Sequence, residues 1–262
     1  MSKKQAYRVE IQYLGFRMHG WSKQPGLKTV HYFVDKTIAF VLQHDRFKTL
    51  GSSRTDAKVS ANAGSFTLWL EDAIDESFFL QELNKNFPTD IRALKVQSVA
   101  PNTNALQPNK MKEYLYLFAF GQKAHPFCAS LVTVLSEPLN LELMKAGAKL
   151  FEGHHNFCNY VTKPSANTQT ERAIAYCQIE ENTFYTASFF PEKSYALRIQ
   201  SQGFMRNQVR LIMGQLFDLG LGKIDLNFIK SSLCEKAQDP LPSIAPGSGL
   251  ILQTIYDQAE SD

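Results

Sequence analysis

Apolar positions recur along the first hundred residues with two different spacings, one typical of helices and one typical of strands. Apolar residues recur every three to four positions in residues 29–43 and 75–87, as in amphipathic helices. Thr29 is the predicted N-cap of the first helix, and Pro88 ends the second. Apolar residues recur at every second position in residues 7–13, as in a half-buried strand, and residues 62–70 and 91–99 also read as strands. The order strand, helix, strand, helix, strand resembles a split βαβ unit. In the second helix, the side chains predicted to face inward are Phe78, Phe79 and Leu83.

The rest of the chain repeats this arrangement. It carries three further helical patterns, in residues 139–151, 205–219 and 225–236. Asp225 is the predicted cap of the last helix. Strand patterns occupy residues 113–120, 172–179, 194–200 and 250–255. Asn and Pro cluster in residues 101–110, which predicts a junction between two α+β halves, residues 1–106 and 107–262.

Composition narrows the class of protein. The chain has 262 residues, of which 44% are hydrophobic and 20% charged, as in an ordinary globular protein that buries a core. No apolar run approaches the roughly 18 residues of a membrane span, and no apolar stretch follows the N-terminal lysines as in a signal peptide. Four cysteines without paired spacing predict reduced thiols in a cytoplasmic protein: Cys128, Cys158, Cys177 and Cys234.

Charge is unevenly distributed. Residues 1–60 hold eleven Lys and Arg against four Asp and Glu, whereas the remaining residues hold seventeen against twenty-one. The local excess favours contact between the N-terminal part and a polyanion. A solvated basic surface explains the same count.

The segment from Gly51 to Ala61 is small and polar, although it lies between a helix and a strand. Arg54 and Lys58 place two cations near Asp56, an arrangement that would keep this carboxylate ionised and available as a nucleophile, base or electrostatic stabiliser. A turn with a surface ion pair is the alternative.

Two more stretches contain side chains that could bind a substrate. Arg206 and Arg210 are four residues apart in a helical pattern and would share one face, which suits a phosphate or carboxylate partner. A plain amphipathic surface helix is the alternative. Tyr114 begins a strand whose aromatic face, continued to Phe120, favours packing in the core over stacking on bases.

Other patterns argue against further chemistry. His154, His155 and Cys158 lack a second pair of ligands at zinc spacing, so we predict no metal site. Glycine-rich phosphate loops, the G-x-S-x-G elbow and dinucleotide fingerprints are missing from the sequence, which disfavours kinases, hydrolases and dehydrogenases.

Taken together, eight stretches in order resemble motifs of the tRNA pseudouridine synthase A family. They are residues 13–25, 29–30, 53–61, 84–91, 112–116, 150–157, 204–214 and 245–252. Ser53, Lys58 and Ser60 depart from the family's G-R-T-D-A-G-V-H-A, where they replace Gly, Gly and His. The family's F-x-A-R-x stretch is degraded here to residues 104–108.

The resemblance implies a fold and an activity. The fold would be α+β, with two ferredoxin-like (split βαβ) halves in a mostly antiparallel extended sheet, flanking helices and a central RNA-binding cleft. The activity would be isomerisation of uridine to pseudouridine in tRNA, at positions 38 to 40 of the anticodon stem-loop. Asp56 would be the essential carboxylate. The resemblance also implies that the protein is a homodimer and needs no cofactor.

The resemblance further assigns residues to the substrate. Tyr114 would stack on the target uracil, Arg210 would pair with Asp56, Arg54 would help to extrude the nucleotide, and Leu250 would line the uracil pocket. Contacts to the rest of the RNA are expected from Arg17, Lys23, Lys58 and Arg206. The departures leave two alternatives open: a synthase with another RNA target, or a non-catalytic RNA-binding protein on the same scaffold.

Overall fold

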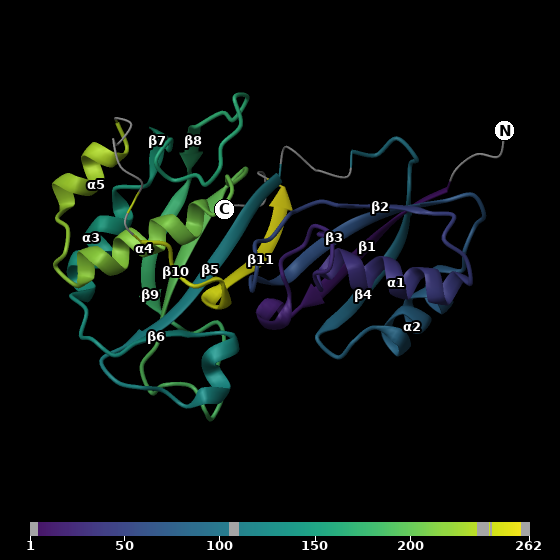
Figure 1. The fold of residues 1–262 in the computed structure, drawn as a ribbon, viewed down its shortest axis with the longest axis horizontal. Helices are drawn as coiled ribbons and strands as arrows, with labels where there is room; N and C mark the ends of the chain where they lie inside the picture. Colours follow the sequence, from purple (N-terminus) through teal and green to yellow (C-terminus); the bar gives the residue numbers. More distant parts are fainter. Residues whose placement is uncertain (1–4, 105–109, 235–240, 242, 258–262) are drawn as a thin grey trace. The chain divides into compact units, whose positions relative to one another are not determined.

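A computed structural model describes residues 5–104, 110–234, 241 and 243–257 (Figure 1). The chain divides into unit 1 (Met1–Pro108) and unit 2 (Asn109–Asp262). The boundary predicted at residues 106 and 107 lies outside the described residues, as does the stretch 105–108 that departs from the family motif. None of the helices in the described residues is long and apolar enough to cross a membrane.

Unit 1 has the βαββαβ order of a ferredoxin-like fold. Its sheet contains β4, β1 and β3 in that order, with β2 paired to β3, and all these pairings are antiparallel. The helices α1 and α2 pack against each other, and α2 packs against β4 (Figure 1). The elements are β1 (Gln5–Tyr13), α1 (Val30–Leu42), β2 (Lys48–Gly51), β3 (Ser60–Leu70), α2 (Glu76–Asn86) and β4 (Ile91–Val99).

Side-chain caps begin both helices of unit 1. The Thr29 hydroxyl accepts a hydrogen bond from the backbone N–H of Tyr32, as the sequence predicts, and Asp75 caps α2 in the same way. Such a cap is worth about 1 kcal/mol. The prediction that Phe78 faces inward is wrong, because its side chain is 62% exposed. The other two inward-facing residues are confirmed, because Phe79 and Leu83 are both buried.

Unit 2 repeats the βαββαβ order. Its sheet runs β11, β5, β10 and β9, again antiparallel, and the short β6 (Thr133–Leu135) pairs in parallel with the end of β5. Helix α3 packs against α4 and β9. The main elements are β5 (Lys110–Phe120), α3 (Leu141–Lys149), β9 (Tyr176–Glu181), β10 (Tyr195–Ser201), α4 (Gln208–Gly220) and β11 (Leu250–Asp257). Three smaller elements are the paired strands β7 (Gly153–Asn156) and β8 (Glu171–Ile174) and the helix α5 (Leu226–Ser232), which Asp225 caps as predicted.

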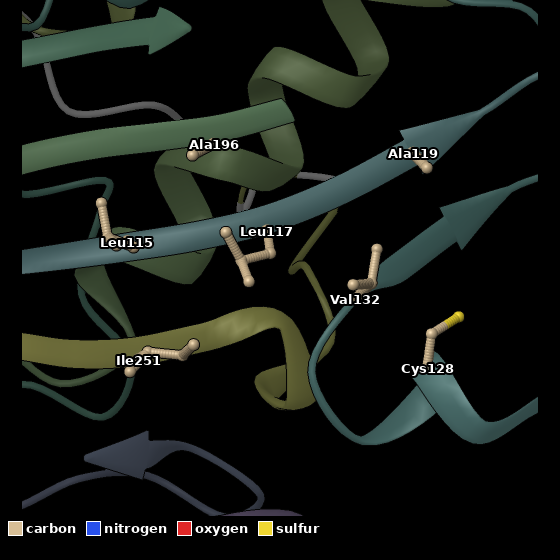
Figure 2. Packing of buried hydrophobic residues seen from close by; sticks show 7 residues of the cluster. All are labelled: Leu115, Leu117, Ala119, Cys128, Val132, Ala196 and Ile251. Atoms are coloured by element: carbon tan, nitrogen blue, oxygen red, sulfur yellow. The ribbon is translucent and has the colours of Figure 1, made fainter. Parts of the chain in front are cut away.

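Strand β5 is buried on both faces, which explains its continuous apolar sequence. On one face, the rings of Tyr116 and Phe118 lie 6.0 and 5.5 Å from the ring of Phe217 in α4. The predicted core role of this aromatic face is therefore confirmed. The other face belongs to a cluster with residues of β10, β11 and the segment before β6 (Figure 2): Leu115, Leu117, Ala119, Cys128, Val132, Ala196 and Ile251.

Two predicted elements of unit 2 have different bounds. The strand expected over residues 172–179 is interrupted at Ala175, so that β8 pairs with β7 while β9 joins the main sheet. The helix expected from residue 205 begins at Gln208, after Asn207 in a left-handed conformation (φ 61°). Arg206 therefore precedes the helix, and its predicted helical spacing with Arg210 is wrong.

Candidate active site

The loop that carries Asp56 connects β2 to β3 and is anchored on both sides of the carboxylate. The hydroxyl of Thr55 lies 2.8 Å from that of Tyr13, and both side chains are buried. The backbone N–H of Trp21 donates to the Thr55 carbonyl at 3.0 Å. Beyond Asp56, the N–H of Lys58 donates to the carbonyl of Met18 at 2.9 Å. Asp56, which is half-buried, is thus presented on a backbone of fixed geometry.

Two glycines let the segment after β1 approach this loop. A Cβ on Gly15 would collide with the carbonyl of Val59, and one on Gly20 would lie 2.8 Å from the carbonyl oxygen of Thr55. Gly20 also has φ +85°, which side-chain-bearing residues rarely adopt. Neither position accommodates a side chain unless the Asp56 loop moves.

Two of the departures from the family motif, Lys58 and Ser53, affect the loop in different ways. Lys58 adopts φ 65°, a left-handed conformation that glycine adopts without strain, and its ammonium lies 5.8 Å from the centre of the Phe16 ring. Ser53 is buried, and its hydroxyl has no hydrogen-bond partner among the described residues. A buried hydroxyl without a partner costs free energy, so both departures act against the stability of the loop.

Two cations, Arg54 and Lys58, flank Asp56 on its own loop. Arg54 and Lys58 are both exposed, and in the part of the chain that the structure describes neither forms an ion pair. Among the described residues, neither cation thus forms an ion pair with the carboxylate. Both cations instead point their charge to solvent, where a phosphate can reach it.

The other two cations predicted to meet RNA in unit 1 are already paired. Arg17 donates to Asp90 through two guanidinium nitrogens, at 3.0 and 2.7 Å. Lys23 forms an ion pair with Asp35 of α1. Because a carboxylate neutralises each of them, their attraction for a phosphate is smaller than that of Arg54 or Lys58.

Tyr114 lies in β5, opposite Ile199 of β10 and Leu252 of β11. Its side chain is 8% exposed, and its ring meets that of Phe204 edge to face at 5.3 Å. An aromatic ring clamped between neighbouring strands loses little entropy when a flat base stacks on it. The ring is therefore held in one orientation within unit 2, and its stacking on the target uracil stays a prediction.

Arg210 in α4 is oriented by backbone and side-chain acceptors. Its Nε donates to the carbonyl of Ala245 at 2.8 Å, and one terminal nitrogen donates to Asn207 at 2.9 Å. Asn207 in turn donates to the hydroxyl of Thr162 at 2.7 Å. These bonds fix the guanidinium plane, which suits recognition of an anion. Arg206, by contrast, is exposed in the turn before α4.

Leu250 is the first residue of β11 and is 4% exposed. It lies opposite Tyr116, whose hydroxyl donates to the carbonyl of Pro246 at 2.8 Å. Burial raises the pKa of the Tyr116 hydroxyl above its ordinary value, against the smaller effect of its hydrogen bond to Thr133, so the group stays protonated and donates. This bond ties the loop that precedes Leu250 to the core.

No group of three His, Cys, Asp or Glu side chains in the described residues is arranged to hold a metal ion. His154 and His155 lie in β7, and the Nε2 of His155 is 2.8 Å from the carbonyl of Glu152. All four cysteines are free thiols.

Sequence reasoning assigned no role to the residues that hold these side chains in place. Trp21 anchors Thr55 through its backbone, and its indole packs against Gly51, the last residue of β2. Both residues lie in stretches that resemble the family motifs, Trp21 in 13–25 and Asn207 in 204–214. The left-handed backbone of Asn207, however, shows only in the structure.

Comparison with known proteins gives concordant results. A family model described as tRNA pseudouridine synthase matches residues 148–257. The chain is 30% identical over 252 residues to "tRNA pseudouridine synthase A" of Dictyoglomus thermophilum, which covers 95% of this chain and 98% of that relative. It is 28% identical to "tRNA pseudouridine synthase A 2" of Bacillus cereus, over 95% and 98% of the two chains. It is 26% identical to "tRNA pseudouridine synthase A 1" of Protochlamydia amoebophila, over 97% of each. Because this similarity runs through both units, the chain belongs to the tRNA pseudouridine synthase A family.

Proposed function

We propose that this protein isomerises uridine to pseudouridine in tRNA, with Asp56 as the essential carboxylate. The observation that carries the proposal is the anchored loop of unit 1, in which hydrogen bonds to Thr55 and Lys58 hold Asp56 from both sides. A binding protein has no need of a half-buried carboxylate in fixed geometry beside exposed cations. Holding a reactive group in a fixed position lowers the activation barrier of the step in which it takes part.

The proposed reaction is balanced within one nucleotide. The bond between N1 of uracil and C1′ of ribose breaks, the base turns, and a bond forms between C5 and C1′. The proton lost from C5 is matched by one gained at N1, so no electrons leave the nucleotide. The reaction therefore requires no electron carrier and no energy donor.

We assign the substrate contacts as follows. Tyr114 stacks on the uracil, Leu250 lines the pocket for it, and Arg210 provides a fixed positive charge. Arg54, exposed next to Thr55, takes the place of the extruded nucleotide, which offsets part of the few kcal/mol that unstacking costs. Asp56 either attacks the base or the sugar as a nucleophile or removes a proton as a general base.

The preferred substrate in this proposal is the anticodon stem-loop, at positions 38 to 40. We further propose that the protein acts as a homodimer in the cytoplasm, where its four free cysteines stay reduced. Sedimentation of the purified chain tests the dimer directly, since the predicted mass is twice 29.6 kDa.

The central test is Asp56→Asn, which keeps the shape of the side chain and removes its charge. We expect the variant to bind unmodified tRNA transcripts as the wild type does and to form no pseudouridine. Glu82→Gln in α2 is the control, because it removes a carboxylate of the same unit that lies outside the loop. Pseudouridine is measured by chemical probing of the product. A variant that converts uridine at the normal rate would exclude Asp56 as the essential group.

A second candidate is the same reaction at another RNA position. It is favoured by Lys58, which is left-handed, and by Ser53, whose hydroxyl has no hydrogen-bond partner among the described residues; both lie where the family has glycines. Mapping pseudouridine in total tRNA, from cells with and without the gene, separates the candidates. Loss at positions 38 to 40 supports the first, loss elsewhere supports the second, and no loss favours a non-catalytic RNA-binding protein.

A further inference from the structure

A second basic and aromatic site lies toward the far end of β3 from the Asp56 loop. Strand β3 begins at Ser60, just after that loop, and Trp69 is nine residues further on, so about 30 Å of strand separates the two. A groove of about 470 Å³ opens here, within the range of about 300–1,000 Å³ typical of ligand sites. It is lined by Arg46, Phe47 and Lys48 before and in β2, by residues 69–71, and by Pro101. We call it the Trp69 groove.

The indole of Trp69 is held in one orientation. Its Nε1 donates to the carbonyl of Pro101 at 3.1 Å. Lys48 lies opposite Trp69 in the register of β2 and β3, and its ammonium is 5.8 Å from the indole centre, close enough for a cation–π interaction. A fixed indole beside a cation is the combination that binds nucleic-acid bases by stacking.

The charges in the groove are available to a ligand. Arg46 and Lys48 are exposed, and among the described residues neither forms an ion pair. The lining also contains one carboxylate, that of Glu71, which is exposed and supplies an acceptor for a ribose hydroxyl or a base N–H. The groove thus presents two cations, an aromatic face and an acceptor within one nucleotide's reach.

We propose that the Trp69 groove binds an unpaired nucleotide of the RNA substrate, distinct from the uridine that reacts. The base stacks on Trp69, and the adjoining phosphates contact Arg46 and Lys48. This inference rests on the proposed function for its ligand, since it takes the RNA to be the substrate tRNA. The groove then helps to set which RNAs bind, without touching the reacting atoms.

Tryptophan fluorescence tests the stacking. The chain has two tryptophans, and Trp21 is only 3% exposed, so quenching by a stacked base reports on Trp69. We expect an unmodified tRNA transcript to quench the wild type and to quench Trp69→Phe far less. Equal quenching of both proteins would overturn the proposal. Uridine 5′-monophosphate that quenches at the same concentration as tRNA would also overturn it, by making the groove a site for free nucleotides.

Binding and turnover give the second test. Trp69→Ala should raise the Kd for tRNA between about five- and a hundredfold, the effect of losing one stacked base, whereas kcat at saturating tRNA stays unchanged. Thermal unfolding and the milder Trp69→Phe variant show whether the fold survives. Arg46→Gln with Lys48→Gln should reduce the slope of log affinity against log salt concentration by about 2, the effect of losing two phosphate contacts.

The control pair is Arg92→Gln with Lys95→Gln, which removes two exposed cations from β4 of the same unit. An equal loss of salt dependence in this pair would mean that only total charge matters, and the proposal would fail. Failure of the proposed function looks different. If the wild type bound tRNA and its tryptophan fluorescence were quenched, yet no pseudouridine formed, the proposed activity would be refuted. The proposal for the Trp69 groove would still stand.

Discussion

Lys58 and Ser53 lie five residues apart in the Asp56 loop, and each occupies a place where the family motif has glycine. The Lys58 backbone still has the conformation that favours glycine, with φ 65°. Ser53 adds a hydroxyl to a buried position where the described residues offer no partner. The loop therefore holds a left-handed lysine and a buried hydroxyl that both act against its stability.

Lys58 permits a direct measurement of that strain. We expect Lys58→Gly to be more stable than Lys58→Ala by about 1 kcal/mol, because both lose the side chain but only glycine adopts φ 65° without strain. Urea denaturation measures the difference. Lys36 in α1 is the matched control, since there the order reverses and alanine is the more stable by about 1 kcal/mol. Equal stability of the two Lys58 variants would show that the left-handed backbone carries no cost.

At the scale of elements, periodicity predicted the long helices and strands, because each buries one face. It missed β2, which has four residues and too few positions to show a period. It placed the start of α4 too early, because the left-handed Asn207 interrupts a pattern that continues in the sequence. It misassigned Phe78, which is exposed, although Phe79 and Leu83 are buried as predicted.

The missed strand β2 is joined to α1 by a polar network. The hydroxyl of Thr49 donates to Asp35 at 2.5 Å, so it accepts from Nε2 of His31 at 2.7 Å. His31 also stacks on Trp21, with ring centres 5.6 Å apart. Since Trp21 anchors Thr55, the network connects α1 to the loop that carries Asp56.

This network predicts a pH dependence of stability. Burial lowers the pKa of His31, aided by Lys23 and opposed by Asp35, so the folded protein takes up this proton at lower pH than the unfolded chain. The free energy of unfolding should therefore fall as the pH drops below the ordinary histidine pKa of about 6.5, until the folded His31 is protonated too. His31→Gln removes the proton site, so it should lose less stability than the wild type between pH 7 and pH 5.

Urea denaturation at the two pH values makes this comparison. His154→Gln, at an exposed position of β7, is the control for loss of a histidine and should keep the wild-type dependence. If His31→Gln lost as much stability on acidification as the wild type, the pH dependence of the free energy of unfolding would come from other groups. The network between α1 and β2 would then not be pH-sensitive.

At the scale of the whole molecule, two units of the same βαββαβ order carry different parts of the candidate machinery. Unit 1 supplies Asp56 and Arg54, and unit 2 supplies Tyr114 and Arg210. Resemblance to the family identified these four residues, because they lie within its motifs. The sequence did not reveal what fixes them, such as the carbonyl of Ala245 that orients Arg210, because such contacts join residues far apart in the chain.

The basic character of the first 60 residues now separates into two kinds of cation. Arg17 and Lys23 are paired with Asp90 and Asp35, whereas Arg54 and Lys58 form no ion pair in the part of the chain that the structure describes. A cation that already holds a carboxylate gains less from a phosphate, because binding must first break the existing pair.

Binding of tRNA should therefore respond unequally to the loss of these four charges. Each counterion-releasing contact contributes about 1 to the slope of log affinity against log salt concentration. We expect Arg54→Gln and Lys58→Gln each to reduce the slope by about 1, and Arg17→Gln and Lys23→Gln to change it much less. Fluorescence anisotropy with labelled tRNA over a range of salt concentrations measures all four slopes. Four equal reductions would mean that the whole basic segment acts as a diffuse charge, and that the ion pairs seen within unit 1 open when RNA binds.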